Sequence, residues 1–133
     1  MQNGIMVIGR VLLGQMFLLA GISKISAFAG TQGYMESMGV PGLLLIPVIV
    51  LEIAGGLAVM LGWQTRLATL TLAGFTLIAA FIFHFDLANQ MQSILFMKNM
   101  AITGGLLMLS TTGAGIWSLD NKTAGNKGSL VGA

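Results

Sequence analysis

The chain has 133 residues, of which 56% are hydrophobic and 8% are charged. Soluble domains carry about 25% charged residues, and a domain this small has a large surface to cover with polar groups. The composition therefore excludes an ordinary soluble domain and indicates a protein that folds in lipid. The net charge of +2 comes from six basic and four acidic side chains. They form no basic patch with interleaved aromatics, so we expect no nucleic-acid partner.

The lack of cysteine and the scarcity of histidine restrict the chemistry. Without Cys the chain cannot hold a disulfide, an iron–sulfur cluster, a thiolate zinc site or a covalent c-type haem. A single histidine excludes bis-histidine haem within one chain. Ten methionines offer thioethers to Cu(I), but their spacing is irregular and methionine is common apolar filler. We therefore expect no haem, iron–sulfur cluster or metal.

Four apolar stretches are long enough for membrane-spanning helices, which need about 20 residues each. They cover residues 5–28, 43–62, 67–85 and 94–112. The polar segment 121–133 predicts a disordered tail. The sequence thus predicts an all-α fold, a polytopic membrane four-helix bundle over residues 1–120. The first stretch also resembles a signal peptide, but Lys24 is badly placed before a cleavage site.

Basic residues are divided unequally between the two sides of this bundle. Four spans place both termini on one side together with Arg10, Arg66, Lys122 and Lys127, and leave Lys24 and Lys98 on the other. Because cytoplasmic segments are richer in Lys and Arg, we expect both termini to be cytoplasmic.

Charged residues inside the apolar stretches share helix faces with small residues. One stripe at helical spacing contains Arg10, Gly14, Phe17, Gly21 and Lys24. The others are Glu52, Gly55, Gly56 and Val59, then Ala73, Thr76, Ala80 and His84, then Lys98, Ala101, Gly105 and Met108. A charge within a bilayer costs roughly 2.5–3.5 kcal/mol and usually faces the bundle interior. We therefore expect the four stripes to meet at the bundle axis.

A short internal repeat links the second and fourth stretches. The segment Ile53-Ala54-Gly55-Gly56-Leu57 is echoed by Ile102-Thr103-Gly104-Gly105-Leu106. Two related hairpins would give this pattern, and so would chance in an apolar sequence of low complexity.

Glu52 is predicted near mid-membrane, with Arg10 on the antiparallel neighbour about 6 Å away along the axis. We expect these residues to form a structural ion pair, directly or through water, because an unpaired mid-membrane carboxylate is costly. The alternative is that Arg10 snorkels to the interface and Glu52 is protonated.

A second polar cluster is expected on the opposite side of the membrane. It contains Lys24, His84, Lys98 and Asn99, with Tyr34, Glu36, Asp86 and Gln90 nearby in sequence. Over an apolar cavity these groups could hold a quinone carbonyl or a small anion. His84 and Lys98 are the catalytic candidates, and Lys24, Glu52 and Asn99 are further binding candidates. The alternative is an interfacial polar cap with snorkelling lysines.

Several segments, taken in order, resemble the DoxX family. They are Arg10–Gly14 with Phe17 and Gly21-x-x-Lys24, Tyr34-Met35, Gly39–Pro41, Glu52-x-x-Gly55-Gly56-Leu57, Leu61-Gly62-x-x-Thr65-Arg66, Phe83-His84, Lys98-Asn99, Gly104–Leu107 and Gly113-x-Gly115-x-x-Ser118-Leu119-Asp120. The resemblance covers residues 5–120, and its specificity lies in the ordered set rather than in any one motif.

This resemblance implies a four-helix protein of the bacterial inner membrane, related to the small subunit of an archaeal thiosulfate:quinone oxidoreductase. Other members resemble partners of redox or detoxification enzymes, or belong to quinone- and catechol-stress systems. A chain without cysteine cannot carry sulfur on a thiol, which limits the sulfur-transfer analogy. The matching family positions are Arg10, Lys24, Glu52, His84, Lys98 and Asn99.

Three functions follow. The leading one is a quinone-interacting membrane subunit of an oxidoreductase or redox-stress system, whose electrons come from a partner protein because the chain has no redox centre of its own. The runner-up is a non-catalytic anchor or assembly subunit of a larger membrane complex. A transporter that relays charge through Arg10 and Glu52 would need an oligomer. The sequence leaves open the substrate, the partner, the oligomeric state and any activity of the chain alone.

Overall fold

The computed structural model describes residues 2–126, and this part of the chain forms helices without strands. The helices are α1 (Gln2–Ser26), α2 (Phe28–Ser37), the 3-10 helix η1 (Gly42–Leu44), α3 (Leu45–Leu61), α4 (Thr65–Phe83), α5 (Gln90–Thr112) and α6 (Leu119–Asn126). Four segments are long and apolar enough to cross a membrane, namely Gln2–Ser26, Gly42–Leu61, Thr65–Phe83 and Gln90–Thr112. The predicted all-α class and its four spans are confirmed.

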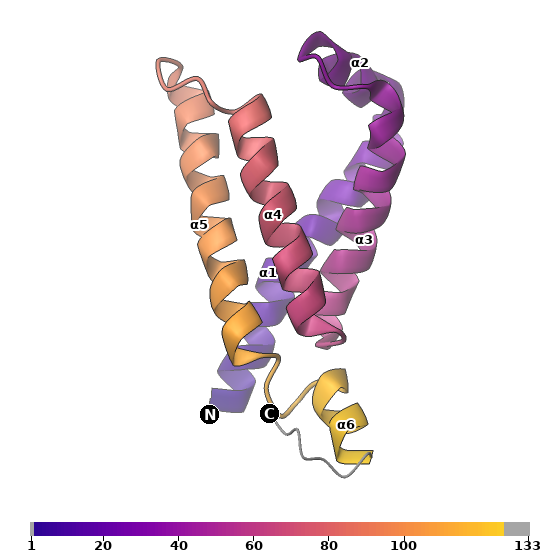
Figure 1. Ribbon diagram of the computed structural model, residues 1–133, viewed down its shortest axis with the longest axis vertical. Helices are drawn as coiled ribbons and strands as arrows, with labels where there is room; N and C mark the ends of the chain where they lie inside the picture. The colour runs from indigo at the N-terminus through magenta and orange to yellow at the C-terminus, as the bar shows by residue number, and fades with distance from the viewer. Residues whose placement is uncertain (1, 127–133) are drawn as a thin grey trace.

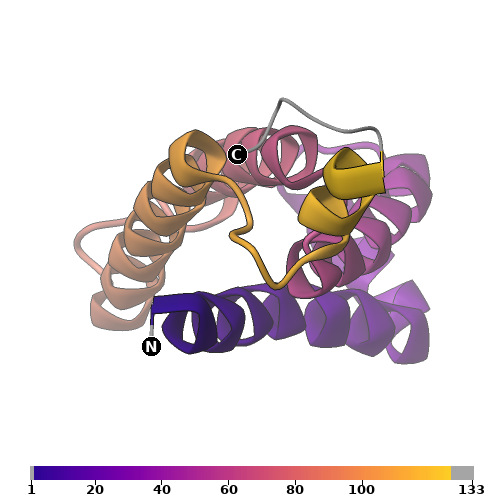
Figure 2. The ribbon, with the colours of Figure 1, turned by 90° about the horizontal axis from the view of Figure 1, so that it is seen from below.

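The long helices run up and down and are packed in two pairs, α1 with α3 and α4 with α5 (Figure 1). Contacts between α3 and α4 join the pairs. The start of α1, the turn from α3 to α4, and α6 lie at one end, which we call the α6 end (Figure 2). The opposite end, with α2, η1 and the loop from α4 to α5, is the α2 end.

Glycines bring α1 and α3 into direct contact. A Cβ atom on Gly14 would lie 2.6 Å from the carbonyl oxygen of Gly56, and one on Gly56 would lie 2.7 Å from that of Gly14. At Gly21 it would lie 2.7 Å from Cγ1 of Ile53. These distances leave no space for a side chain, so the close approach depends on the small residues. We call this interface the α1/α3 seam.

Three of the four predicted stripes face the interior. The buried members are Arg10, Gly14, Phe17 and Gly21 on α1, Glu52, Gly55, Gly56 and Val59 on α3, and Ala73, Thr76 and Ala80 on α4. The prediction for the fourth stripe is wrong, because Lys98, Ala101 and Met108 are exposed on α5. A lysine has a long aliphatic stem that carries its ammonium to a polar interface, so it does not have to face inward.

The segment between the first two spans contains a helix that the sequence did not predict. α1 ends at Ser26, two residues before the predicted end of the first span, and α2 begins at Phe28 and continues to Ser37. Met35 of α2 is buried against Leu45 and Ile49 of α3. α2 therefore covers the α2 end of the bundle through an apolar contact of its own.

The C-terminal part is also more ordered than predicted. Residues 119–126 form α6, although a disordered tail was expected from residue 121; residues 127–133 lie outside the described residues. The Asp120 carboxylate accepts hydrogen bonds from the backbone N–H groups of Gln64 (2.7 Å) and Thr65 (2.9 Å). The start of α4 has no capping side chain of its own, so Asp120 supplies the acceptor that a helix N-terminus requires.

Candidate functional site

A cavity of about 270 Å3, which we call the pocket, lies in the half of the bundle nearer α2. Its apolar lining residues are Met16, Phe17, Met35, Leu45, Val48, Phe75, Ala79 and Phe83. Its polar lining residues are Lys24, Thr31, Tyr34, Glu52, Thr76, His84 and Asn99. An apolar cavity with a few convergent polar groups is the usual form of a small-molecule site. The volume suits one ring-sized group.

Lys24 and Glu52 form an ion pair on one wall of the pocket. The Lys24 Nζ lies 2.9 Å from Glu52 Oε1 and donates a hydrogen bond to Oε2 at 3.2 Å. The Glu52 side chain is 5% exposed, whereas that of Lys24 is 30% exposed. Glu52 Oε1 is buried and accepts no hydrogen bond. The pair therefore presents an ammonium and a carboxylate beside an apolar cavity, and Lys24 is the polar partner of both carboxylate oxygens.

The predicted ion pair between Arg10 and Glu52 is wrong. Because Gly21 of α1 lies against Glu52 and Ile53, Arg10 is level with the end of α3, about ten residues or ~15 Å from Glu52. The guanidinium donates instead to backbone carbonyl oxygens, from Nη1 to Met60 (3.1 Å) and from Nη2 to Trp117 (2.5 Å). The sequence estimate of depth was too coarse to choose between Arg10 and Lys24 as the partner of Glu52.

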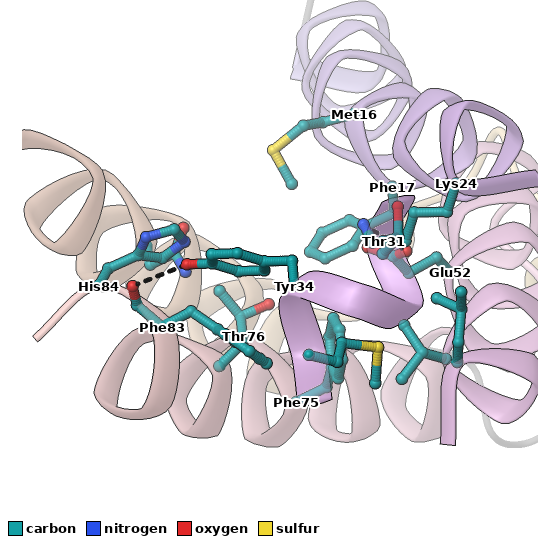
Figure 3. A pocket seen from close by; sticks show the side chains of 15 residues that line it. Met16, Phe17, Lys24, Thr31, Tyr34, Glu52, Phe75, Thr76, Phe83 and His84 are labelled. Carbon is teal, nitrogen blue, oxygen red and sulfur yellow. Dashed lines mark hydrogen bonds and ion pairs between the residues drawn. The ribbon is translucent and has the colours of Figure 1, made fainter. Parts of the chain in front are cut away.

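On the opposite wall, His84 is oriented by Gln92, a residue that no sequence pattern predicted in the site. Its Nδ1 lies 2.8 Å from Oε1 of Gln92, in the first turn of α5. With the amide oxygen of Gln92 facing the ring, the contact is satisfied by the tautomer that carries its proton on Nδ1, and this tautomer leaves Nε2 available to another partner. The hydroxyl of Tyr34 donates to the carbonyl oxygen of Phe83 at 3.4 Å. Figure 3 shows His84 and Lys24 on opposite sides, with Tyr34 and Phe17 between them.

Of the two adjacent polar residues on α5, Asn99 lines the pocket and Lys98 does not. Lys98 is exposed, and successive helix positions are turned about 100° from one another. The pocket thus brings together Lys24, Glu52, His84 and Asn99 of the predicted binding residues, and leaves out Lys98 as well as Arg10.

This arrangement can bind and orient a polar ring and move a proton. Lys24 is a cationic donor, Asn99 offers both a donor and an acceptor, and His84 exchanges protons at Nε2. Within residues 2–126, no three acidic or histidine side chains gather in a way that could hold a metal ion.

The fold and the pocket define a polytopic helical membrane protein with a buried polar site. The DoxX family model matches residues 5–85, and the chain belongs to this family. It is 50% identical to "Inner membrane protein YqjF" of Escherichia coli K12 over 113 residues, which cover 85% of this chain and 87% of that protein. It is 33% identical to "Inner membrane protein YphA" of the same organism over 125 residues, 89% of each chain.

A shorter similarity links the chain to a protein with a redox name. It is 34% identical over 73 residues to "Putative oxidoreductase CatD" of Bacillus subtilis 168, covering 55% of this chain and 54% of that one. No solved structure matches the chain.

Proposed function

We propose that the pocket binds the ring of a quinone, and that the chain is the quinone-interacting membrane subunit of an oxidoreductase or redox-stress system. The observation that carries this proposal is the placement of polar groups on two opposite walls, Lys24 with Glu52 on one and His84 on the other. A 1,4-quinone has an oxygen at each of two opposite edges of an apolar ring. Aromatic side chains that line the pocket, such as Phe17 and Phe75, suit contact with the face of such a ring. The similarity to a protein named as an oxidoreductase supports a redox role.

When bound, a quinone takes up two electrons and two protons, with the electrons supplied here by a partner oxidoreductase subunit. Lys24 donates a hydrogen bond to one ring oxygen and keeps its contact with Glu52. Doubly protonated His84 would donate one of these protons from Nε2 to the ring oxygen beside it, and the neutral ring that remains would keep its Nδ1–H on Gln92. The Lys24 ammonium would supply the second proton to the opposite ring oxygen, and in the reverse reaction the two groups would take these protons back. Glu52 Oε1, which is buried without a hydrogen bond, can accept from a hydroxyl on the other edge.

We further propose that the protein lies in the bacterial inner membrane with both termini in the cytoplasm. The names of the two Escherichia coli relatives support the membrane. The excess of basic residues at the α6 end, where Arg66 and Lys122 are exposed, supports the orientation.

Because the chain has no cysteine, single introduced cysteines can report this orientation directly. In intact cells, a membrane-impermeant maleimide should label Ala88→Cys, in the loop from α4 to α5, and leave Lys122→Cys on α6 unlabelled. The reverse pattern would place the termini outside the cytoplasm.

The quinone proposal is tested by extraction and by binding. Solvent extraction of the purified protein followed by mass spectrometry should recover a quinone. A tail-less 1,4-benzoquinone should bind the protein in detergent. Loss of one hydrogen bond to the ligand costs about 1.4 kcal/mol, so His84→Phe and Asn99→Leu should each weaken binding about tenfold.

Lys98→Met is the matched control, because Lys98 lies one residue from Asn99 but outside the pocket. We expect it to leave quinone affinity unchanged. If no quinone is extracted and none binds on addition, the proposal is overturned.

A non-catalytic membrane anchor or assembly subunit is the alternative function. It is favoured by the exposed small residues Ala101 and Gly104 on α5, where another helix could approach closely. Purification in mild detergent discriminates the two. A constant protein partner with no bound quinone would favour the anchor.

A further inference from the structure

One side of the four-helix arrangement is not closed by helix packing. α1 packs on α3, α3 on α4, and α4 on α5, whereas α1 and α5 face each other across a cavity of about 500 Å3. We call this cavity the α1/α5 groove. Added Cβ atoms on Gly9 of α1 and on Gly105 of α5 would meet nothing within 4 Å. Both positions are therefore open, and neighbouring side chains do not fill the groove there.

The groove is mainly apolar. Ile5, Met6 and Leu13 line it from α1, and Met108 and Leu109 line it from α5. Arg10 borders it, but both Nη atoms are engaged by backbone carbonyl oxygens of α3 and of the segment before α6. Apart from Arg10, the residues that line the groove carry no charge, so the lining fits a hydrocarbon chain.

The α1/α5 groove follows the pocket along the same two helices. On α1, Leu13 in the groove is one helical turn from Met16 and Phe17 in the pocket. On α5, Gly105 in the groove is about 9 Å along the axis from Asn99 in the pocket. Met16 stands at the junction, and its unbranched side chain adapts readily to a passing ligand. From Leu13 to Gln2 the groove extends a further ~16 Å toward the α6 end.

We infer that the α1/α5 groove holds the hydrocarbon tail of the molecule whose ring occupies the pocket, so that the ligand is a lipid-soluble quinone with a prenyl or alkyl chain. This inference rests on the proposed quinone function and deepens it. Because lipid chains are as apolar as the groove, the affinity that the groove adds comes from van der Waals packing of the tail against its walls and not from the hydrophobic effect. It gives the tail a path along the bundle while the ring is seated.

The test fills the groove and compares two ligands in the same detergent. Gly105→Leu has space for its side chain and should fold. It should weaken binding of a decyl or prenyl 1,4-benzoquinone about tenfold or more, because the tail and the leucine compete for one volume. The tail-less 1,4-benzoquinone should bind within about twofold of wild type. The mutant-to-wild-type ratio cancels the partitioning of the tailed ligand into micelles.

Two further variants test whether the effect is specific to the groove. Gly9→Leu fills the same groove from the α1 wall and should repeat the result. Gly104→Leu adds the same side chain to an open position that does not line the groove, and should affect neither ligand.

Equal weakening of tailed and tail-less ligands by Gly105→Leu, or no effect on either, overturns the inference and leaves the quinone proposal standing. If native mass spectrometry shows that Gly105→Leu converts a dimer to a monomer without changing tail preference, a second copy occupies the groove and the inference is also overturned. If neither ligand binds the wild type, the proposed function fails and the inference fails with it.

Discussion

The two sides of α1 illustrate how one sequence motif can serve opposite purposes. Toward α3, Gly56 belongs to the segment 53–57 and touches the backbone of Gly14. Toward α5, the matching Gly105 belongs to the segment 102–106 and has no neighbour within 4 Å of a Cβ position. The first glycine closes a seam and the second borders a groove. Small residues in a membrane helix therefore indicate that a helix or a ligand could approach closely, but they do not show that the partner is a helix of the same chain.

Replacing the glycine on the closed side should have the largest effect. Gly56→Leu forces a side chain into the backbone of Gly14 and Leu18, and should lower the free energy of unfolding by about 3 kcal/mol or more. The measurement is unfolding by SDS titration, followed by circular dichroism. The repeat-equivalent Gly105→Leu should stay close to wild type. Equal losses from the two variants would remove the distinction between seam and groove.

A charged residue that contacts α3 and one on the exposed face of α5 should also differ in how much they contribute to the free energy of unfolding. Lys24→Met leaves the Glu52 carboxylate buried without its partner and should cost about 3 kcal/mol of stability. Lys98→Met, on the exposed face of α5, should cost almost nothing in the same titration. Adding Glu52→Gln to Lys24→Met should restore part of the loss. A Lys24→Met protein as stable as Lys98→Met would contradict the ion pair.

At the α6 end of the α1/α3 seam, Arg10 donates hydrogen bonds both to α3 and to the segment before α6. Arg10→Met should lower unfolding free energy by about 2 kcal/mol, the order expected for hydrogen bonds to a charged group. Hydrogen exchange should rise at residues 114–120, which lose this anchor. Arg66→Met is the control, because Arg66 is exposed at the same end. Unchanged exchange at residues 114–120 would argue against the anchor.

The smallest effect is expected at the cap of α4. Asp120→Ala removes the acceptor for the N–H groups of Gln64 and Thr65, and should cost about 1 kcal/mol. Asp86→Ala, in the exposed loop from α4 to α5, is the matched carboxylate control. Both are measured by the same unfolding titration, and a loss no larger than that of Asp86→Ala would exclude the capping role.

The sequence predicted the four spans because apolar length and low charge decide whether a segment can cross a bilayer. It also predicted the inward faces of α1, α3 and α4, where Arg10, Glu52 and Ala80 are buried. α2 was missed because the segment combines glycines with an apolar face carried by few residues, such as Met35. α6 was missed because its order follows from a tertiary contact, that of Asp120 with the turn before α4.

Most residues of the candidate site were predicted from the sequence, but the ion pair that Glu52 forms was not. Lys24, His84 and Asn99 converge on the pocket as expected. Helical periodicity gives a residue's direction to within a helix face, but it does not give relative depth between two helices. Gly21, by packing on Ile53, sets that depth and so assigns Glu52 to Lys24 instead of Arg10. Gln92 had no sequence signal, because its role depends on the loop that returns α5 to the side of His84.

The contact between Asp120 and the start of α4 also bears on the order in which the protein is made. The backbone donors at Gln64 and Thr65 leave the ribosome some 55 residues before the carboxylate that will accept from them. Arg10 is synthesised still earlier relative to its partner, because the carbonyl of Trp117 that accepts its hydrogen bond is 107 residues downstream. All four spans can therefore enter the membrane before the α6 end is completed. A product terminated before residue 117 would contain every span and yet lack the piece that ties the first helix to the middle turn.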